Sequence, residues 1–228
     1  MSKAQFVKKM FDDISSRYDL LNDILSLGMH RLWKKKFVKN VLKSAPHNLL
    51  DCATGTGDLV FIAEKLGAQN ILGIDFSEKM IDEANSRAVL SHSGAQFQTA
   101  DITRLPFPDK SFDAAMVSFG VRNLEDLDKG LQELSRVSKS LYILEFGQPT
   151  SRLYARAYFL LLRLYVPIFG LITGRKDAYE YLIKSSEQFP SGRVFNDILK
   201  RNTDYKSFEY KPIFGGIAYA YQSTGGKS

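Results

Sequence analysis

Residues 49–59 read Leu49-Leu50-Asp51-Cys52-Ala53-Thr54-Gly55-Thr56-Gly57-Asp58-Leu59. A short apolar run ends at Asp51, the chain turns through two glycines, and a helix-like apolar pattern begins at Leu59. This order predicts a strand, a tight turn and the start of a helix. Glycine allows positive φ and lets a ligand approach the bare backbone. The helix start offers free N–H groups and the positive end of a dipole. The stretch therefore predicts a ligand-binding turn.

Two kinds of ligand occupy such a turn, dinucleotides and S-adenosylmethionine, and the spacing favours the second. A dinucleotide loop has the pattern G-x-G-x-x-G, but Val60 stands at the third glycine position. Asp51 and the two glycines instead fit D-x-A-x-G-x-G, the first motif of class I methyltransferases. S-adenosylmethionine carries an ammonium and a sulfonium group, and Asp51 and Asp58 are suitable neighbours for them. The glycines alone also fit an ordinary turn of an α/β domain, so the choice depends on the residues that follow.

The composition indicates one large globular domain in a reducing compartment. The chain has 228 residues, of which 44% are hydrophobic and 25% charged, and this suits a soluble protein with a full core. A single cysteine excludes an internal disulfide framework, and we expect Cys52 to be buried in the first strand. The three histidines and one cysteine show no metal-ligand spacing. We therefore expect no metal.

Charge is unevenly distributed along the chain. Residues 1–50 carry a net charge of +6, residues 51–150 carry −6, and residues 151–228 carry +6. Basic ends of this kind fit nucleic acid, an anionic membrane surface or plain solvation. No nucleic-acid-binding motif is visible, so we expect no nucleic-acid partner.

The amino-terminal residues 1–47 predict a helical cap. They lack the apolar run of a signal peptide, and three early aspartates argue against a transit peptide, so we expect a cytoplasmic protein. Apolar residues recur at helical spacing from Val7 to Leu25, and a second helix is predicted over about 30–44.

Residues 48–149 alternate strand and helix, which predicts a doubly wound parallel sheet with helices on both faces. After the first strand, further strands are predicted at 71–75, about 95–100, 113–118 and 141–146. Asp75 ends the second strand, where a carboxylate can accept both ribose hydroxyls of an adenosine. Asp101 follows the third strand and is placed to accept from the adenine amine. With Asp51, three acids end three successive strands, and together they predict a site.

Residues 150–190 form an apolar helical insertion. The segment 152–165 is almost wholly apolar apart from Arg152, Arg156 and Arg163. Pro167 and the arginines make it a poor membrane span. Three interpretations stay open: it covers a large apolar cavity, it lies at a membrane interface with its arginines toward the headgroups, or it is a buried core helix with snorkelling arginines.

Residues 191–228 predict a terminal helix and a hairpin. The helix covers about 191–202, and two strands near 205–211 and 214–221 are separated by a turn at Pro212. Strands this close pair antiparallel, because a parallel crossover needs a dozen or more residues. Five parallel strands followed by an antiparallel hairpin are the Rossmann-like arrangement of class I methyltransferases. We predict this fold for a single domain over 1–228, whereas a Rossmann oxidoreductase would need another helical crossover.

A longer amino-terminal pattern is more specific than the glycine turn. It reads Tyr18-Asp19-x-x-Asn22-Asp23-x-x-Ser26-x-Gly28-x-His30-Arg31-x-Trp33-Lys34. Further patterns follow in order: Thr54-Gly55-Thr56-Gly57-Asp58, Leu105-Pro106-Phe107-Pro108-Asp109, Phe119-Gly120-x-Arg122-Asn123, Leu144-Glu145-Phe146, Tyr179-x-Tyr181-Leu182 and Gly215-Gly216-Ile217. In these patterns the chain resembles the C-methyltransferases of ubiquinone and menaquinone biosynthesis (the UbiE type). It departs from them at 136–141, where the family's Lys-Pro-Gly-Gly turn is absent.

The resemblance implies methyl transfer from S-adenosylmethionine to a ring carbon of a polyprenylated quinol. Arg122 and Asn123 fall on the family's proposed catalytic pair. Glu145, Tyr179 and Tyr181 are lesser candidates for a proton relay. The candidate cofactor-binding residues, from the turn and from the resemblance, are Asp51, Thr54, Gly55, Thr56, Gly57, Asp75, Asp101, Ile102 and Ser118.

Partners and alternatives follow from the same patterns. We expect peripheral contact with the inner face of the cytoplasmic membrane, since an isoprenoid tail needs an apolar groove that opens toward the bilayer. A homodimer stays open. So do a methyltransferase for another hydrophobic small molecule, a dinucleotide-dependent oxidoreductase and a non-catalytic cofactor-binding scaffold. The sequence does not distinguish a benzoquinol from a naphthoquinol ring.

Overall fold

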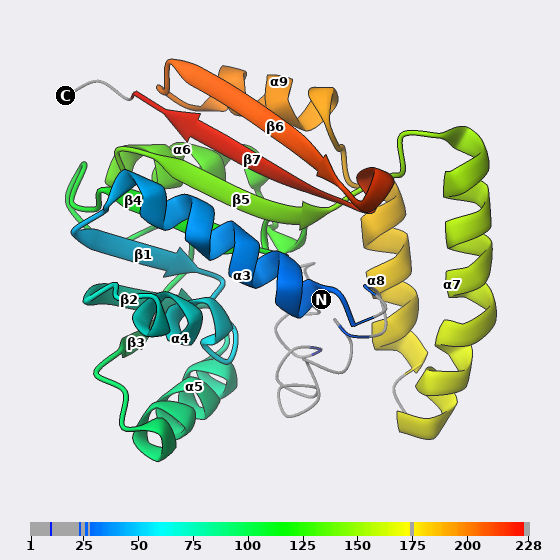
Figure 1. Ribbon diagram of the computed structural model, residues 1–228, viewed down its shortest axis with the longest axis horizontal. Helices are drawn as coiled ribbons and strands as arrows, with labels where there is room; N and C mark the ends of the chain where they lie inside the picture. The colour runs from blue at the N-terminus through cyan, green and yellow to red at the C-terminus, as the bar shows by residue number, and fades with distance from the viewer. Residues whose placement is uncertain (1–9, 11–22, 24–25, 27, 174–175, 226–228) are drawn as a thin grey trace.

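The computed structural model describes residues 10, 23, 26, 28–173 and 176–225, without the side chains of 165–180 and 182. Within these residues the fold is built on a seven-stranded sheet with the strand order β3-β2-β1-β4-β5-β7-β6 (Figure 1). The predicted helix between Val7 and Leu25 lies almost entirely outside the described residues.

Strands β1 to β5 are parallel to one another, and β6 and β7 form an antiparallel hairpin, as predicted. The hairpin joins the sheet through β7, which pairs antiparallel with β5. The strands are β1 (Asn48–Cys52), β2 (Asn70–Asp75), β3 (Gln96–Thr99), β4 (Ala114–Ser118), β5 (Leu141–Phe146), β6 (Ser207–Ile213) and β7 (Ala218–Thr224). The chain runs outward from β1 to β3 and then returns to β4 on the other side of β1. Ligands bind at this switch point in open α/β sheets, outside the carboxyl ends of the strands.

Helices cover both faces of the sheet (Figure 1). They are α3 (His30–Val41), α4 (Asp58–Lys65), α5 (Glu78–Ser91), α6 (Leu127–Val137), α7 (Arg152–Thr173), α8 (Lys176–Gln188) and α9 (Arg193–Asn202). Successive strand residues point to opposite faces, so Leu49 joins the core under α3 and α4, and Leu50 joins the core under α6 and α9. The buried Cys52 lies in the second of these cores.

The hairpin turn differs from the prediction. β6 continues through Pro212 to Ile213, and the chain turns at the short 3₁₀ helix η4 (Phe214–Gly216). β6 is the outermost strand and pairs only with β7, so a proline without an N–H is tolerated there. Gly215 and Gly216 have positive φ values of +68° and +97°. The glycines therefore form the turn, and the expectation that Pro212 forms it was wrong.

The turn before β5 has its own means of support in place of proline and glycine. Arg136, near the end of α6, donates to the carbonyl oxygens of Leu105 and Phe107 and pairs with Glu133 and Asp109. One guanidinium thus ties the end of α6 to the 105–109 loop. This turn lies at the amino end of β5, away from the switch point.

Helix α7 presents apolar side chains outward. The leucines at 153, 160, 161 and 164 are between 47% and 79% exposed, and Arg152, Arg156 and Arg163 are exposed beside them. Tyr158 and Leu162 are buried against the rest of the protein. The buried core-helix interpretation is therefore wrong for the described part of α7. Among the helices as described, none combines the length and the apolar character needed to span a bilayer.

Candidate functional site

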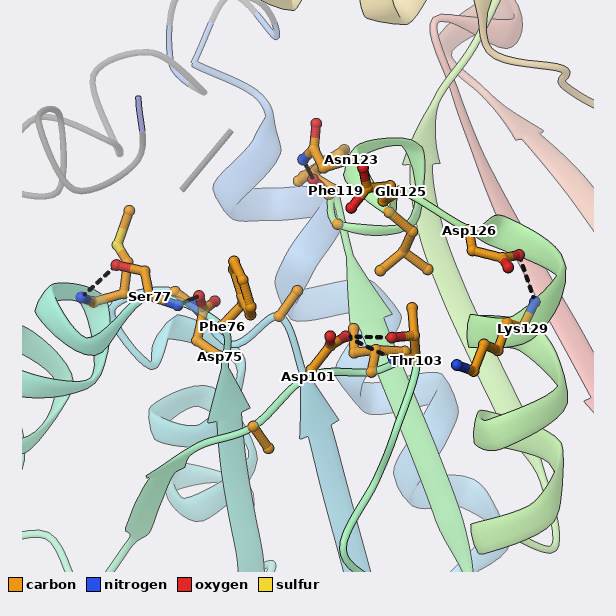
Figure 2. Close-up of a pocket in the computed structure, with 17 residues that line it drawn as sticks. Asp75, Phe76, Ser77, Asp101, Thr103, Phe119, Asn123, Glu125, Asp126 and Lys129 are labelled. Carbon is orange, nitrogen blue, oxygen red and sulfur yellow. Dashed lines mark hydrogen bonds between the residues drawn. The ribbon is translucent and has the colours of Figure 1, made fainter. Parts of the chain in front are cut away.

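A cavity of about 230 Å³ opens at the carboxyl ends of β1, β2 and β4. Its walls come from the turn after β1, the start of α5, the residues after β3, and the segment between β4 and α6. The lining residues are Ala53, Gly55, Asp75, Phe76, Ser77, Met80, Ala100, Asp101, Ile102, Thr103, Phe119, Gly120, Asn123, Leu124, Glu125, Asp126 and Lys129. Five of the predicted site residues are among them: Gly55, Asp75, Asp101, Ile102 and Asn123. Figure 2 shows Asp75, Asp101 and Asn123 around one space.

The carboxylate of Asp75 is held by backbone donors. Its Oδ2 accepts from the N–H of Gly55 at 2.9 Å, and its Oδ1 accepts from the N–H of Ser77 at 2.9 Å. Ser77 in turn caps α5, because its hydroxyl accepts from the N–H of Met80. The strand end, the glycine turn and the helix start therefore fix the orientation of this acid at the cavity wall.

Asp51 lies under the turn and does not line the cavity. Its Oδ2 accepts from the Thr54 hydroxyl at 2.6 Å, and the residue is almost fully buried. Burial raises the pKa of the Asp51 carboxyl to about 7, although the Thr54 hydroxyl and the Lys34 ammonium favour its charged form. A cation bound near the turn would favour ionised Asp51 further.

Asp58 begins α4 and bridges two cations. Its Oδ2 lies 2.8 Å from Nζ of Lys34, and its Oδ1 lies 2.9 Å from Nη2 of Arg87. Burial opposes the charged form, but the two cations outweigh it and hold the pKa of Asp58 well below its usual range. Arg87 also donates to the carbonyl and the hydroxyl oxygen of Thr56. The charge of Asp58 is thus already balanced by protein side chains.

Arg122 and Glu145 form a buried ion pair beneath Asn123. Their side chains are 0% and 1% exposed, and Nη1 of Arg122 donates both to Glu145 and to the carbonyl oxygen of Phe119. Burial raises the pKa of Glu145, while the guanidinium and two backbone N–H groups limit the rise. Arg122 follows β4 in the 3₁₀ helix η3 (Val121–Asn123), and its guanidinium lies over the ring of Phe146. Its neighbour Asn123 reaches the cavity wall, but Arg122 does not.

Asn123 is oriented from a distant helix. The hydroxyl of Tyr181, on α8, donates to Oδ1 of Asn123 at 3.2 Å, and Nδ2 of Asn123 points toward the carbonyl oxygen of Phe119. Burial raises the pKa of Tyr181, so its phenol stays a hydrogen-bond donor near neutral pH. The side chain of Tyr179 lies outside the described residues.

The remaining predicted residues surround the cavity without lining it. Thr54, Thr56 and Gly57 shape the turn, and Ser118 ends β4 with a buried hydroxyl. Phe76, Met80 and Lys129 also line the cavity and were not among the predicted site residues. Of these three, only Phe76 could have been predicted, because it directly follows Asp75 at the end of a strand. At Gly120, a Cβ would meet the Cβ of Ala53 at 2.5 Å, so this wall needs glycine.

A family model described as the ubiE/COQ5 methyltransferase family matches residues 1–225. The chain belongs to the ubiE/COQ5 methyltransferase family. It is 40% identical over 225 residues to a protein of Bdellovibrio bacteriovorus named ubiquinone/menaquinone biosynthesis C-methyltransferase UbiE, with 96% of each chain covered. It is 38% identical over 221 residues to a demethylmenaquinone methyltransferase of Deinococcus radiodurans, with 95% of this chain and 91% of that protein covered.

Solved structures of low identity share the fold of this ubiE/COQ5 family member. A methyltransferase of Thermotoga maritima, described as dependent on S-adenosylmethionine, superposes with a TM-score of 0.65 at 17% identity and covers 95% of this chain and 98% of its own. A methyltransferase of Methanococcus maripaludis gives 0.60 at 17% identity, with 97% and 93% covered. The predicted class I, Rossmann-like fold is confirmed, and the enzyme is an S-adenosylmethionine-dependent methyltransferase.

The cavity suits S-adenosylmethionine. Asp75 presents a fixed carboxylate, Asp101 is a second acid on the same wall, and the side chains of Met80 and Ile102 add an apolar surface for a flat ring. The cavity is lined mainly by oxygen acceptors and apolar side chains and has no cluster of cations. An adenosine that carries no phosphates needs partners of this kind. Across the described residues no group of three or more potential metal ligands is gathered.

Proposed function

We propose that this enzyme methylates a ring carbon of a polyprenylated quinol in menaquinone or ubiquinone biosynthesis, and that its preferred methyl acceptor is demethylmenaquinol. The observation that carries the proposal is the likeness to two relatives, at 40% and 38% identity over nearly the whole chain. One is named a ubiquinone/menaquinone biosynthesis C-methyltransferase and the other a demethylmenaquinone methyltransferase. The position of Asn123 at the wall of the cofactor cavity supports it.

In this proposal each wall of the cavity receives one part of S-adenosylmethionine. Asp75 accepts the ribose hydroxyls, and Asp101 and Ile102 receive the adenine. Gly55 lets the backbone approach the ligand, while Thr54, Thr56 and Gly57 hold the turn and Ser118 closes the end of β4. Asp51 faces the cationic end across the turn. When bound, the cofactor supplies the electrophilic methyl group.

The chemistry requires a nucleophilic ring carbon held in line with the methyl group. A quinol carbon gains that character when the neighbouring hydroxyl gives up its proton, and phenols titrate near ~10. Nδ2 of Asn123 donates to the quinol oxygen, while Tyr181 fixes the Asn123 carbonyl. Arg122 acts from beneath, because its buried positive charge favours the developing phenolate and its bond to Phe119 holds the loop. Orientation of this kind supplies roughly 7–11 kcal/mol.

Affinity for the cofactor should increase with pH. A cation at the turn needs ionised Asp51, whose pKa is about 7 in the free protein, so protonation competes with binding. We expect about tenfold weaker binding of S-adenosylmethionine near pH ~6 than near pH ~8. Calorimetry should compare it with S-adenosylhomocysteine, which has the same amino group but no sulfonium charge. The pH slope should be steeper for S-adenosylmethionine and should flatten in Asp51→Asn. Equal slopes for the two ligands would contradict this role of Asp51.

Helix α7 is proposed to contact the membrane surface from which a long-tailed quinol is drawn. Its outward leucines and exposed arginines suit an apolar interior and anionic headgroups. The helical cap, cofactor core, insertion and tail hairpin then act as one domain, at the inner face of the cytoplasmic membrane. A homodimer would be compatible with this placement.

A charge on the outward face of α7 should affect long-tailed substrates selectively. Leu160→Glu and Leu161→Glu place carboxylates where lipid would lie, so we expect at least ~10-fold less activity on a long-tailed quinol in anionic vesicles. Activity on a short-tailed analogue in solution should stay within about twofold. Leu90→Glu on α5 is the matched control, because Leu90 is also exposed, at 81% against 59% for Leu160 and 47% for Leu161. An equal loss on both substrates, or no loss on either, would count against the proposal.

The decisive experiment transfers a labelled methyl group in vitro. Purified enzyme and labelled S-adenosylmethionine are offered demethylmenaquinol, a demethylated benzoquinol, a sterol and a simple phenol, and the products are identified by mass spectrometry. We expect label on the ring carbon of a quinol. Label on the sterol or phenol instead would favour a different hydrophobic substrate. The quinone profile of cells that lack the protein should show an accumulating demethyl species, and this species names the ring.

A further inference from the structure

The amino-terminal pattern that runs from Tyr18 to Lys34, the signature, contacts the cofactor turn through Lys34. This lysine lies on α3 with a side chain only 5% exposed, and its Nζ is 2.8 Å from Oδ2 of Asp58. Lysine is rarely buried unless it is paired. The pair joins residues 24 positions apart, so it connects the signature directly to the first residue of α4.

The start of α3 is anchored so that Lys34 has a defined position. Ser26 accepts from the backbone N–H of His30, and Asp23 accepts from the side chains of His30 and Arg31. Burial and the charge of Lys34 lower the pKa of His30 to about 4, so His30 is neutral near pH 7. The described part of the signature thus forms a support for one buried ammonium.

The charge of Lys34 acts on both acids of the turn. It pairs with Asp58, which Arg87 of α5 holds from the other side, and Arg87 also holds Thr56. Around Asp51, the Thr54 hydroxyl and Lys34 of α3 favour the ionised carboxylate, whereas burial, Asp75 of β2 and Asp58 of α4 oppose it.

We propose that Lys34 is a positioning residue for the methyl donor: its buried ammonium fixes the start of α4 through Asp58 and places a positive charge beside the acids of the cofactor turn. The signature residues from Asp23 to Lys34 therefore serve the donor rather than the quinol. The inference rests on the proposed function only for the identity of the methyl acceptor, the quinol.

Lys34→Gln should weaken donor binding and shift its pH dependence upward. Without the ammonium, Asp51 ionises at higher pH, so calorimetry with S-adenosylmethionine at pH ~7 should show about fivefold to tenfold weaker binding. The midpoint of the pH dependence should increase, the KM for the donor should increase with it, and the KM for the quinol should stay within about twofold. Lys35→Gln removes the same charge from an exposed position on α3 and should change none of these values. Lys34→Arg should recover part of the affinity.

Asp58→Asn should shift the midpoint of the pH dependence of donor binding in the opposite direction. It removes a negative charge that opposes ionisation of Asp51 and leaves Lys34 in place, so the midpoint should move to lower pH. If circular dichroism shows that Lys34→Gln does not fold, this direction decides the question. An unchanged or increased midpoint in Asp58→Asn would overturn the proposal. So would unchanged donor affinity in folded Lys34→Gln, or an increased KM for the quinol alone. The binding measurements need no quinol, so a wild type that binds donor without methylating quinols would refute only the proposed function.

Discussion

Replacement of Asp75 by asparagine should reduce the affinity for S-adenosylmethionine by about 10²–10⁴-fold. The carboxylate has two oxygens, each already aligned by a backbone N–H, from Gly55 and from Ser77. An asparagine has one acceptor oxygen, and its NH2 group would face one of those donors. The side chain would then rotate or leave a backbone N–H unsatisfied, and the ribose hydroxyls would lose a charged acceptor.

This magnitude follows from the hydrogen bonds at stake. A hydrogen bond to a charged group contributes roughly 1.5–3 kcal/mol, and two of them contribute about 3–6 kcal/mol, if the two add. Calorimetric titration of the purified variant measures the loss. Asp82→Asn is the matched control, since Asp82 is an exposed aspartate on α5 and should bind the cofactor normally. Affinity in Asp75→Asn within about tenfold of wild type would contradict the assignment of Asp75 to the ribose.

Removal of the Arg122 charge should reduce kcat by about 10²–10³-fold and leave donor affinity within about threefold of wild type. Arg122→Met fills a similar volume and lacks the cation, so the developing phenolate loses its buried positive neighbour. Single-turnover measurement with saturating donor and demethylmenaquinol reads the chemical step. Because Arg122 does not line the cavity, the affinity for the donor should not follow kcat.

The same substitution also leaves Glu145 buried without its cation, which should cost about 3–5 kcal/mol of unfolding free energy. The double variant Arg122→Met/Glu145→Gln removes both charges. The two backbone N–H groups bind different oxygens of Glu145, so the single carbonyl oxygen of glutamine keeps an acceptor for one of them. Urea denaturation should show part of the stability recovered, while kcat stays low. If the double variant recovers kcat together with stability, Arg122 is a structural residue and its electrostatic role is wrong.

Much of the fold could be predicted from the sequence, because its signals are local. The apolar run at 49–52, the glycine turn and the apolar pattern after Leu59 each specify the conformation of their own residues. Two closely spaced strands at the end of the chain leave only an antiparallel pairing. The predicted position of the hairpin turn was wrong because Pro212, which is a turn signal in most contexts, was assigned to the turn. In this protein it lies in the edge strand β6, where a proline without an N–H is tolerated.

The candidate site was predicted in part. Gly55, Asp75, Asp101, Ile102 and Asn123 line one cavity, as expected for residues that end parallel strands at one edge of a sheet. The burial of Arg122 was not expected, since a motif position after β4 does not indicate which side chain of a 3₁₀ helix points inward. Tyr181 was only a lesser candidate, and the structure shows it orienting Asn123 from α8.

The glycine turn, the order of strands and helices, and the acids at successive strand ends all follow from residues that are neighbours in the chain. The ion pairs around the turn and behind Asn123 do not. Lys34 meets Asp58 from 24 residues away, Arg87 meets it from 29, and Glu145 meets Arg122 from 23. Periodicity and turn chemistry act over a few residues, whereas an ion pair and a raised pKa depend on which helices pack against which strand end. The position of the turn was therefore readable from its own residues, but the charges around it, and with them the proposed role of Lys34, required the folded chain.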